Sequence, residues 1–193
     1  MEFRIRGIRI QISFYFFAVL SLLFLFDPKG FAMAGFLSCI CHEAGHLIAF
    51  ALMGVPLESL SFLPFGLRII PKLGLTLPQK EIVLLLAGPA VNLILFAVFL
   101  FTGVQLPFAA ANLLIGIFNL IPIAPLDGGR ALRIFLEIFF SEERVCWVCR
   151  ILSGIMIGGI GIGGCVLIFQ SRYNFTLLLC AGYLFFLTFC KKK

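Results

Sequence analysis

The sequence is poor in charge. Only 12% of its 193 residues are charged, whereas about a quarter are in a typical soluble domain, and 62% are hydrophobic. A disordered chain is excluded because such chains are highly charged and poor in apolar residues. An ordinary soluble domain is excluded by the excess of apolar residues, which gives a mean hydropathy of +1.14. The composition therefore predicts an integral membrane protein.

Other features are also missing. The sequence shows no long polar domain, no low-complexity tract, no repeat and no cleavable signal peptide, since its first apolar run is long and lacks a small-residue cleavage site. One Trp and three Tyr accompany 24 Phe. The net charge of +6 does not suggest a nucleic-acid partner, because the basic residues lie beside apolar runs and face a bilayer boundary instead. We expect one transmembrane domain over residues 1–193.

Six apolar runs are long enough for spanning helices, which need about 20 residues. They lie near residues 8–26, 31–53, 81–101, 107–126, 147–169 and 174–190. If the N-terminus is cytoplasmic, only Lys29 and Arg172 of the fifteen Lys and Arg residues lie outside, and the other thirteen lie inside. This bias fits the positive-inside rule. The sequence thus predicts an all-α, multi-pass membrane protein with six transmembrane helices and both termini in the cytoplasm.

The segment between the second and third runs, residues 54–80, is not a regular helix. It contains four prolines, at positions 56, 64, 71 and 78, and proline breaks helices. The segment is too apolar for a solvated loop, and irregular backbone near a bilayer must be covered by protein or line a watery cavity. We therefore predict short extended or β pieces associated with the membrane.

Ionisable side chains are concentrated within the second run. The stretch CHEAGH, residues 41–46, contains the only two histidines of the chain. On a helix, His42 and His46 share one face and can bind one metal ion, while Glu43 can hold the attacking water. This is the H-E-x-x-H pattern of zinc-dependent peptide hydrolysis. A pair of hydrogen-bonded core histidines is the alternative, but ionisable groups together at bilayer depth indicate function.

A catalytic zinc takes three protein ligands and keeps one position open. The extended protease motif with a third histidine is absent, because Ala49 and Leu52 occupy its later positions. Among the nine acidic residues, Asp127 has the best setting, since it ends an apolar run in FNLIPIAPLDGGR, residues 118–130, between prolines and glycines that can turn the backbone inward. Cys39, three residues before His42, is a rival ligand.

Three motifs together resemble those of the site-2 proteases, a family of intramembrane zinc metalloproteases. HEAGH lies in one predicted span, NLIPIAPLDGG in a later one, and AGPAVNLIL, residues 87–95, between them. The resemblance implies a Zn²⁺ ion and a catalytic core at about residues 31–130. It implies metal ligands at His42, His46 and Asp127, with catalytic roles for Glu43 as general base and for Asn119 near the oxyanion. Asn92 is expected to support the site.

Within that family, the predicted six-span shape is most similar to the branch that processes sporulation sigma-factor precursors. The resemblance implies a bacterial cell membrane, a membrane-associated protein substrate and inhibitory membrane partner proteins. Neither the CBS domain of many members of that branch nor the PDZ domain of relatives that cut anti-sigma factors is recognisable. The alternative substrates are a single-span anti-sigma factor and a signal-peptide remnant. Residues 54–80 would either offer a strand edge to the substrate or form a passive loop on the membrane.

Two alternatives from other functional classes use the same residues. A metal-binding membrane carrier would need an open path, but the outer halves of the predicted spans lack the acidic residues to line one. An inactive scaffold is disfavoured because Glu43 is present. Cys146 and Cys149 form an isolated C-x-x-C pair that could be redox-active or bind metal, although free thiols are the simpler interpretation.

Overall fold

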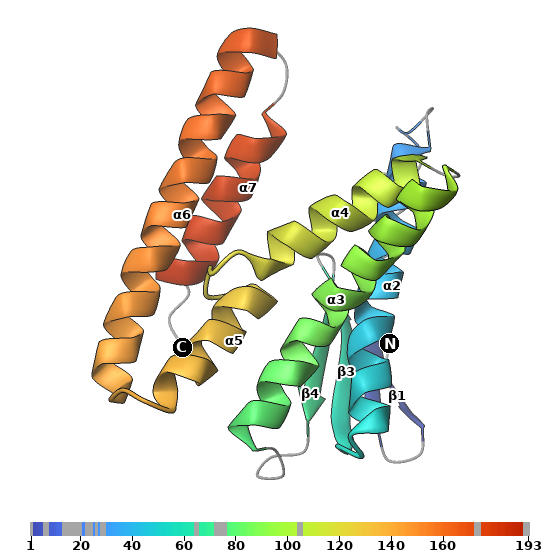
Figure 1. Cartoon of the computed structure of the whole chain (residues 1–193), viewed down its shortest axis with the longest axis vertical. Helices are drawn as coiled ribbons and strands as arrows, with labels where there is room; N and C mark the ends of the chain where they lie inside the picture. Colours follow the sequence, from blue (N-terminus) through green and yellow to red (C-terminus); the bar gives the residue numbers. More distant parts are fainter. Residues whose placement is uncertain are drawn as a thin grey trace. The chain divides into compact units, whose positions relative to one another are not determined.

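A computed structural model shows a mainly helical chain (Figure 1). Its contacts divide it into two compact units, Met1–Ile117 and Phe118–Lys193, which are described in turn. The predicted single domain with its core at residues 31–130 stays a prediction. The structure describes residues 2–5, 8–12, 21, 25, 27, 30–63, 66–71, 77–103, 106–171 and 175–190.

Local sequence signals delimit the first long helices. Helix α2, Phe31–Leu52, begins where the carboxylate of Asp27 accepts hydrogen bonds from the backbone N–H groups of Phe31 and Ala32, at 3.1 and 2.5 Å. Helix α3, Pro78–Thr102, has a proline in its first turn and ends at Gly103, whose φ of 67° is left-handed. Proline at the start and glycine after the end are favoured for steric reasons. Helix α4 follows at Leu106–Leu120.

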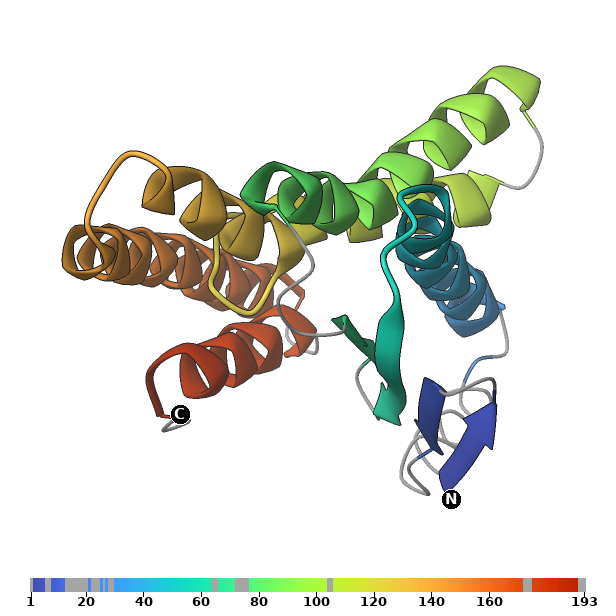
Figure 2. The same ribbon diagram turned by 90° about the horizontal axis from the view of Figure 1, so that it is seen from below.

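Four strands form one sheet in the order β1-β2-β3-β4 (Figure 2). They are β1, Glu2–Ile5, β2, Ile8–Ile12, β3, Leu57–Leu63, and β4, Gly66–Pro71. The predicted all-α fold is therefore incomplete, and a span beginning at residue 8 is wrong. Polar and apolar residues alternate from Ile8 to Ile12, which is the period of a strand and not of a helix. Most of the remaining residues of that predicted span lie outside the described part.

The predicted extended segment at 54–80 contains strands β3 and β4, which pair antiparallel. Strand β3 also pairs with β2, in a parallel register. Because β3 has a neighbour on each side, β4 is the outer strand of the sheet within this segment. The association of these strands with a membrane stays a prediction.

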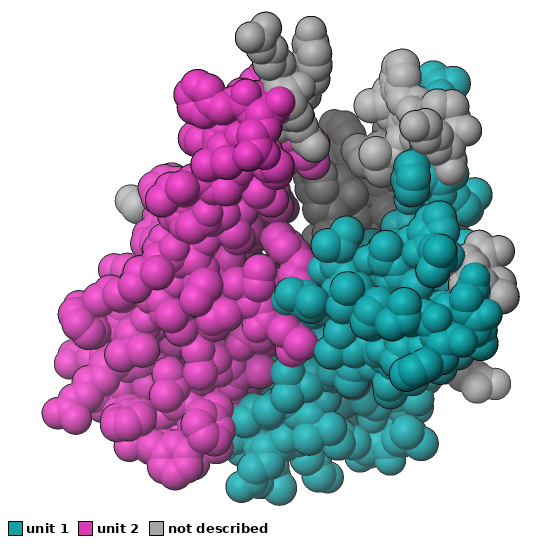
Figure 3. Space-filling view, turned by 45° about the horizontal axis from the view of Figure 1, so that its top comes forward, with its two compact units in different colours: residues 1–117 teal, residues 118–193 magenta. Residues whose placement is uncertain are grey.

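The second unit, whose described residues are magenta in Figure 3, contains helices and no strand among those residues. It contains α5, Asp127–Glu137, α6, Glu142–Ser171, α7, Thr176–Phe185, and the π-helix η1, Phe186–Cys190. Helices α6 and α7 pack side by side (Figure 1). Their core is made by four buried residues: Ile123, Ile157, Ala181 and Leu184.

Two helix boundaries in this region differ from the prediction. Helix α4 ends at Leu120, six residues before the predicted end at 126, because Pro122 and Pro125 lack the N–H that would continue it. Asp127 then opens a separate helix, α5, instead of ending the fourth span. That helix is amphipathic and short, so an apolar-run criterion does not find it.

Among the described residues, three helices are long and apolar enough to cross a membrane: Phe31–Leu52, Pro78–Thr102 and Glu142–Gln170. They match the second, third and fifth predicted spans. The fourth and sixth runs form shorter apolar helices, Leu106–Leu120 and Thr176–Cys190, so six spanning helices are not confirmed. Large apolar side chains such as Phe101 and Phe169 are exposed, at 88% and 86%, as suits a lipid-facing surface.

Candidate metal centre

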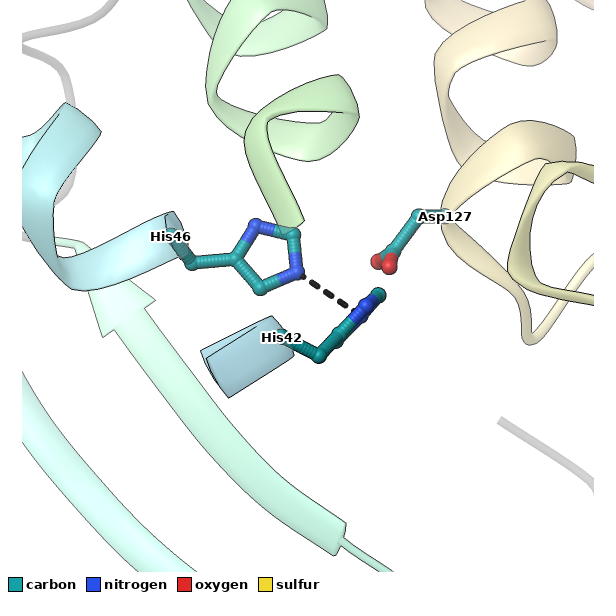
Figure 4. A group of neighbouring side chains, drawn as sticks. All are labelled: His42, His46 and Asp127. Carbon is teal, nitrogen blue, oxygen red and sulfur yellow. Dashed lines mark hydrogen bonds between the residues drawn. The ribbon is translucent and has the colours of Figure 1, made fainter. Parts of the chain in front are cut away.

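The two histidines of helix α2 converge on one point. His42 and His46 are one helical turn apart, and they are only 5% and 7% exposed. Their ring centroids lie 4.8 Å apart and their Nε2 atoms 3.2 Å apart (Figure 4). Two nitrogens that each bind zinc at about 2.0–2.1 Å in a tetrahedral site would lie about 3.3 Å apart. The observed separation therefore fits a shared zinc ion.

The other ring nitrogens of the two histidines bond to α3. His42 Nδ1 lies 2.8 Å from Asn92 Oδ1, and His46 Nδ1 lies 2.7 Å from the carbonyl oxygen of Leu84. Both partners are acceptors only, so each Nδ1 must donate its hydrogen. In neutral rings each Nε2 then carries a lone pair. Two lone pairs that face each other across 3.2 Å repel, and a shared cation relieves that repulsion.

Asp127 completes a group that could hold a metal ion. One ligand atom from each of His42, His46 and Asp127 lies within 4.8 Å of the others (Figure 4). Two imidazoles and one carboxylate are a donor set that catalytic zinc uses. The rival ligand Cys39 is not part of this group, and its side chain is exposed on α2. The role of Asp127 as the third ligand stays a prediction.

Two glycines let α2 and α3 approach each other at the histidines. A Cβ atom on Gly45 would lie 2.8 Å from the carbonyl oxygen of Ala87, and one on Gly88 would lie 2.7 Å from His46 Cε1 and 2.9 Å from His42 Cε1. Real Cβ atoms are essentially never found below 3.0 Å from such neighbours. Small residues at this crossing allow the backbones of membrane helices to pack closely. The same feature places the acceptors of α3 beside both imidazoles.

Asp127 is held by a tightly packed turn in the second unit. Cβ atoms on Gly128 and Gly129 would clash with the backbones of Leu120 and Ile123, respectively. One turn residue, Ala124, donates its backbone N–H to the Oγ of Ser153 on α6 at 3.1 Å. Ser153 is 1% exposed, so this bond satisfies a buried hydroxyl. The close packing of this turn thus fixes the position of the Asp127 backbone at the start of α5.

The two residues with predicted catalytic roles, Glu43 and Asn119, lie on α2 and α4. Glu43 follows His42 on α2, and Asn119 is near the end of α4; both are half-buried. Their catalytic roles stay predictions. All seven cysteines lie within the described residues and are free thiols, Cys146 and Cys149 among them. Free thiols were the simpler interpretation of that pair.

The sequence analysis missed three polar residues that support the site: Ser38, Asn112 and Ser153. All three are nearly or completely buried. One signal was available for Ser38, because it lies four residues before His42 and so on the same helix face. Asn112 could have been noticed as a polar side chain in an apolar helix, where such groups mark packing or function.

Several known proteins are similar to this chain in sequence or in fold. The model of peptidase family M50 matches residues 105–158. A protein of Synechocystis named a zinc metalloprotease is 34% identical over 150 residues, which are 68% of this chain and 39% of that protein. A zinc metalloprotease of Methanocaldococcus jannaschii is 36% identical over 117 residues, covering 53% of this chain and 33% of its own length.

The solved structure of a site-2 protease from Methanocaldococcus jannaschii has the same fold. Its TM-score is 0.67 at 24% sequence identity, and the match covers 96% of this chain and 92% of that one. The chain is thus similar to peptidase family M50 over residues 105–158 and shares its fold with a site-2 protease. The M50 match and the three apolar helices together also indicate a membrane protein. The chain spans 39% and 33% of the lengths of the Synechocystis and Methanocaldococcus relatives.

Proposed function

We propose that this protein is an intramembrane zinc metalloprotease that hydrolyses a peptide bond in or near the bilayer. The geometry of the two histidines carries the proposal. Their Nδ1 atoms are committed as donors to α3, and their Nε2 atoms are 3.2 Å apart. With both Nδ1 hydrogens donated to α3, the two Nε2 atoms of neutral rings have no hydrogen to share between them, whereas a common metal ion would use both lone pairs.

His42, His46 and Asp127 would hold the zinc ion. When bound, zinc acts as a Lewis acid and lowers the pKa of water to about 7. Glu43, beside His42 on α2, accepts the proton of the attacking water and later passes it to the departing amine nitrogen. The water oxygen bonds to the carbonyl carbon and the C–N bond breaks. One proton of the water ends on the amine, and the other stays on the new carboxyl group until it ionises. Asn119 would donate an amide hydrogen to the developing oxyanion.

A substrate held in a membrane helix must become extended before attack, because its own hydrogen bonds shield the scissile carbonyl. The outer strand β4 of the first unit is a candidate edge for the extended peptide, since an edge strand has backbone groups left for pairing. Proline at residues 67–70 would remove backbone donors from that edge. Cleavage that persists with such prolines would contradict the pairing idea and favour a passive loop.

We further propose a bacterial cell membrane, with both termini in the cytoplasm, as the location. The substrate would be a sporulation sigma-factor precursor, in line with the resemblance to stage IV sporulation protein FB. A single-span anti-sigma factor or a signal-peptide remnant is the alternative. Inhibitory membrane partners would restrain the enzyme, because hydrolysis is irreversible and its substrate shares the membrane.

The test is a co-expression assay with wild type, Glu43→Gln and the control Glu143→Gln, which changes an exposed residue at the start of α6. Each is paired with a sigma-factor precursor and, separately, with single-span membrane proteins. We expect wild type and the control to shorten a substrate, and Glu43→Gln to retain zinc without cleaving. If zinc-containing wild type cleaves none of them, or if Glu43→Gln cleaves normally, the proposal is wrong.

A further inference from the structure

A buried polar network lies beneath His42, within the first unit. Ser38 on α2, Asn92 on α3 and Asn112 on α4 are each 0% exposed. Burying an amide without a hydrogen-bond partner is unfavourable, so buried amides are normally hydrogen-bonded. Here every hydrogen of both carboxamides has an acceptor. The network therefore has only one low-energy arrangement of its hydrogen bonds.

The arrangement begins at a backbone carbonyl of α4. Asn112 Nδ2 lies 2.9 Å from the carbonyl oxygen of Phe108 and 2.9 Å from Ser38 Oγ. A carbonyl can only accept, so the NH₂ of Asn112 must face Phe108. Its Oδ1 therefore faces Asn92, whose Nδ2 donates to it at 2.8 Å.

Asn92 is oriented in turn by two acceptors. Its Nδ2 donates to Asn112 Oδ1 and, at 3.1 Å, to the backbone carbonyl of Ser38. If the amide were flipped, its oxygen would face both of these acceptors. The native orientation leaves Oδ1 toward His42 Nδ1 at 2.8 Å, so the hydrogen of that ring must reside on Nδ1.

The alternative tautomer of His42 could form without moving either ring, and it would interfere with metal binding. With its hydrogen on Nε2, His42 could donate to His46 Nε2 across 3.2 Å. That bond would occupy the two atoms that face the proposed metal. A histidine with no acceptor at Nδ1 would adopt it, because it removes the repulsion between the lone pairs.

We propose that Asn92 and Asn112 are positioning residues that hold His42 in its Nδ1–H tautomer, so that Nε2 is kept for the metal. Asn92 acts on His42 directly, and Asn112 acts by orienting Asn92. This inference deepens the proposed function, and its metal-binding part rests on it. Partners that fix the tautomer of a metal-binding histidine typically change metal affinity by about 10–100-fold when removed.

The composition of the chain makes the test direct. Because His42 and His46 are its only histidines, ¹⁵N-histidine labelling of the full chain gives four ring-nitrogen signals. They are read by solid-state NMR in lipid bilayers after zinc is removed with a chelator. We expect both rings of the wild type to carry hydrogen on Nδ1. A wild-type His42 with its hydrogen on Nε2 would overturn the proposal before any variant is made.

Two variants of Asn92 separate positioning from packing. Asn92→Leu removes the acceptor, and we expect His42 to move its hydrogen to Nε2 and zinc to bind about 10–100-fold more weakly. Asn92→Asp keeps an oxygen at Nδ1 but loses the amide donors, so it should retain the wild-type tautomer. If both variants behave alike, either both keeping or both losing the Nδ1 hydrogen, Asn92 does not set the tautomer. Should Asn92→Leu fail to fold, the wild type and Asn92→Asp decide.

Asn112 is tested by zinc affinity in Asn112→Leu. The Ser38 carbonyl then remains as the anchor of the Asn92 amide, and we expect an affinity between those of wild type and Asn92→Leu. Wild-type affinity would remove Asn112 from the proposal. The NMR readout needs neither substrate nor metal. An inactive chain with the expected tautomers would therefore refute the protease alone, and an active chain with the other tautomer would refute this inference alone.

Discussion

A single methyl group at Gly88 should displace both histidines. In Gly88→Ala, the new Cβ would lie 2.7 Å from His46 Cε1 and 2.9 Å from His42 Cε1. Ordinary contact begins near 3.4 Å, so the two Cε1 atoms would have to retreat by about 0.7 and 0.5 Å, and His46 Nε2, which lies closer still to the new Cβ, by more. Neither ring is loose, because their Nδ1 atoms are held at 2.8 Å by Asn92 and at 2.7 Å by Leu84.

The displacement is large for a metal site, whose ligands must be held to within about 0.5 Å. Either the hydrogen bonds stretch toward about 3.2 Å, where they weaken, or the Nε2 atoms move off the shared point. We expect zinc to bind about 10–100-fold more weakly. This corresponds to about 1.4–2.8 kcal/mol. When zinc is limiting, the rate of proteolysis should fall at least in proportion to the fraction of the chains that lose zinc.

The assay is zinc affinity by competition with a chelator of known strength, on detergent-purified protein. Gly35→Ala is the matched control, since Gly35 is on the same helix as the histidines and a Cβ there meets nothing within 4 Å. Alanine is the better helix former, so the control should bind zinc normally and remain folded. Wild-type zinc affinity in Gly88→Ala would refute the reasoning, because the rings would then not be confined by α3.

Three further changes test other parts of the two units. Asp127→Ala should lower the zinc content, measured by elemental analysis, below one ion per chain, and it should abolish cleavage. A full zinc content in this variant would exclude Asp127 as a ligand. Ser153→Ala leaves the Ala124 N–H without its acceptor, which should destabilise the fold by about 1–3 kcal/mol and lower the thermal midpoint. An unchanged midpoint would show that the turn does not depend on that bond. Gly45→Ala places a Cβ 2.8 Å from the backbone oxygen of Ala87, so it should lower the free energy of unfolding by about 1–3 kcal/mol. An unchanged thermal midpoint would contradict the close approach of α2 and α3.

Much of the site was predictable because its signals are local. The four-residue spacing of His42 and His46 places them on one helix face regardless of what surrounds the helix. Asp127 could be selected by elimination, since few acidic residues lie in an apolar setting. The turn before it was also foreseeable as a break, although not as the start of helix α5, because a short amphipathic helix leaves no long apolar run.

The fold was predictable only where apolar runs are long. Helices α2, α3 and α6 each contain enough apolar residues to be found by length. The sheet was harder to predict. Its strands β2 and β3 are about 45 residues apart in the chain and pair in parallel, and no local pattern specifies which distant strands meet.

The sequence by itself determined the candidate chemistry: the H-E-x-x-H spacing, the candidate third ligand and the predicted membrane environment all follow from residue type and helical period. Only the tertiary structure decided how that chemistry is held. His42 and Asn92 are 50 residues apart, and Asn92 and Asn112 are 20 apart. Whether such groups bond depends on the distance between helix axes, and for His42 and Asn92 the glycines at the α2–α3 crossing allow the short distance. A hydrogen bond requires its atoms to lie within about 3 Å, and no periodicity along the chain encodes that distance.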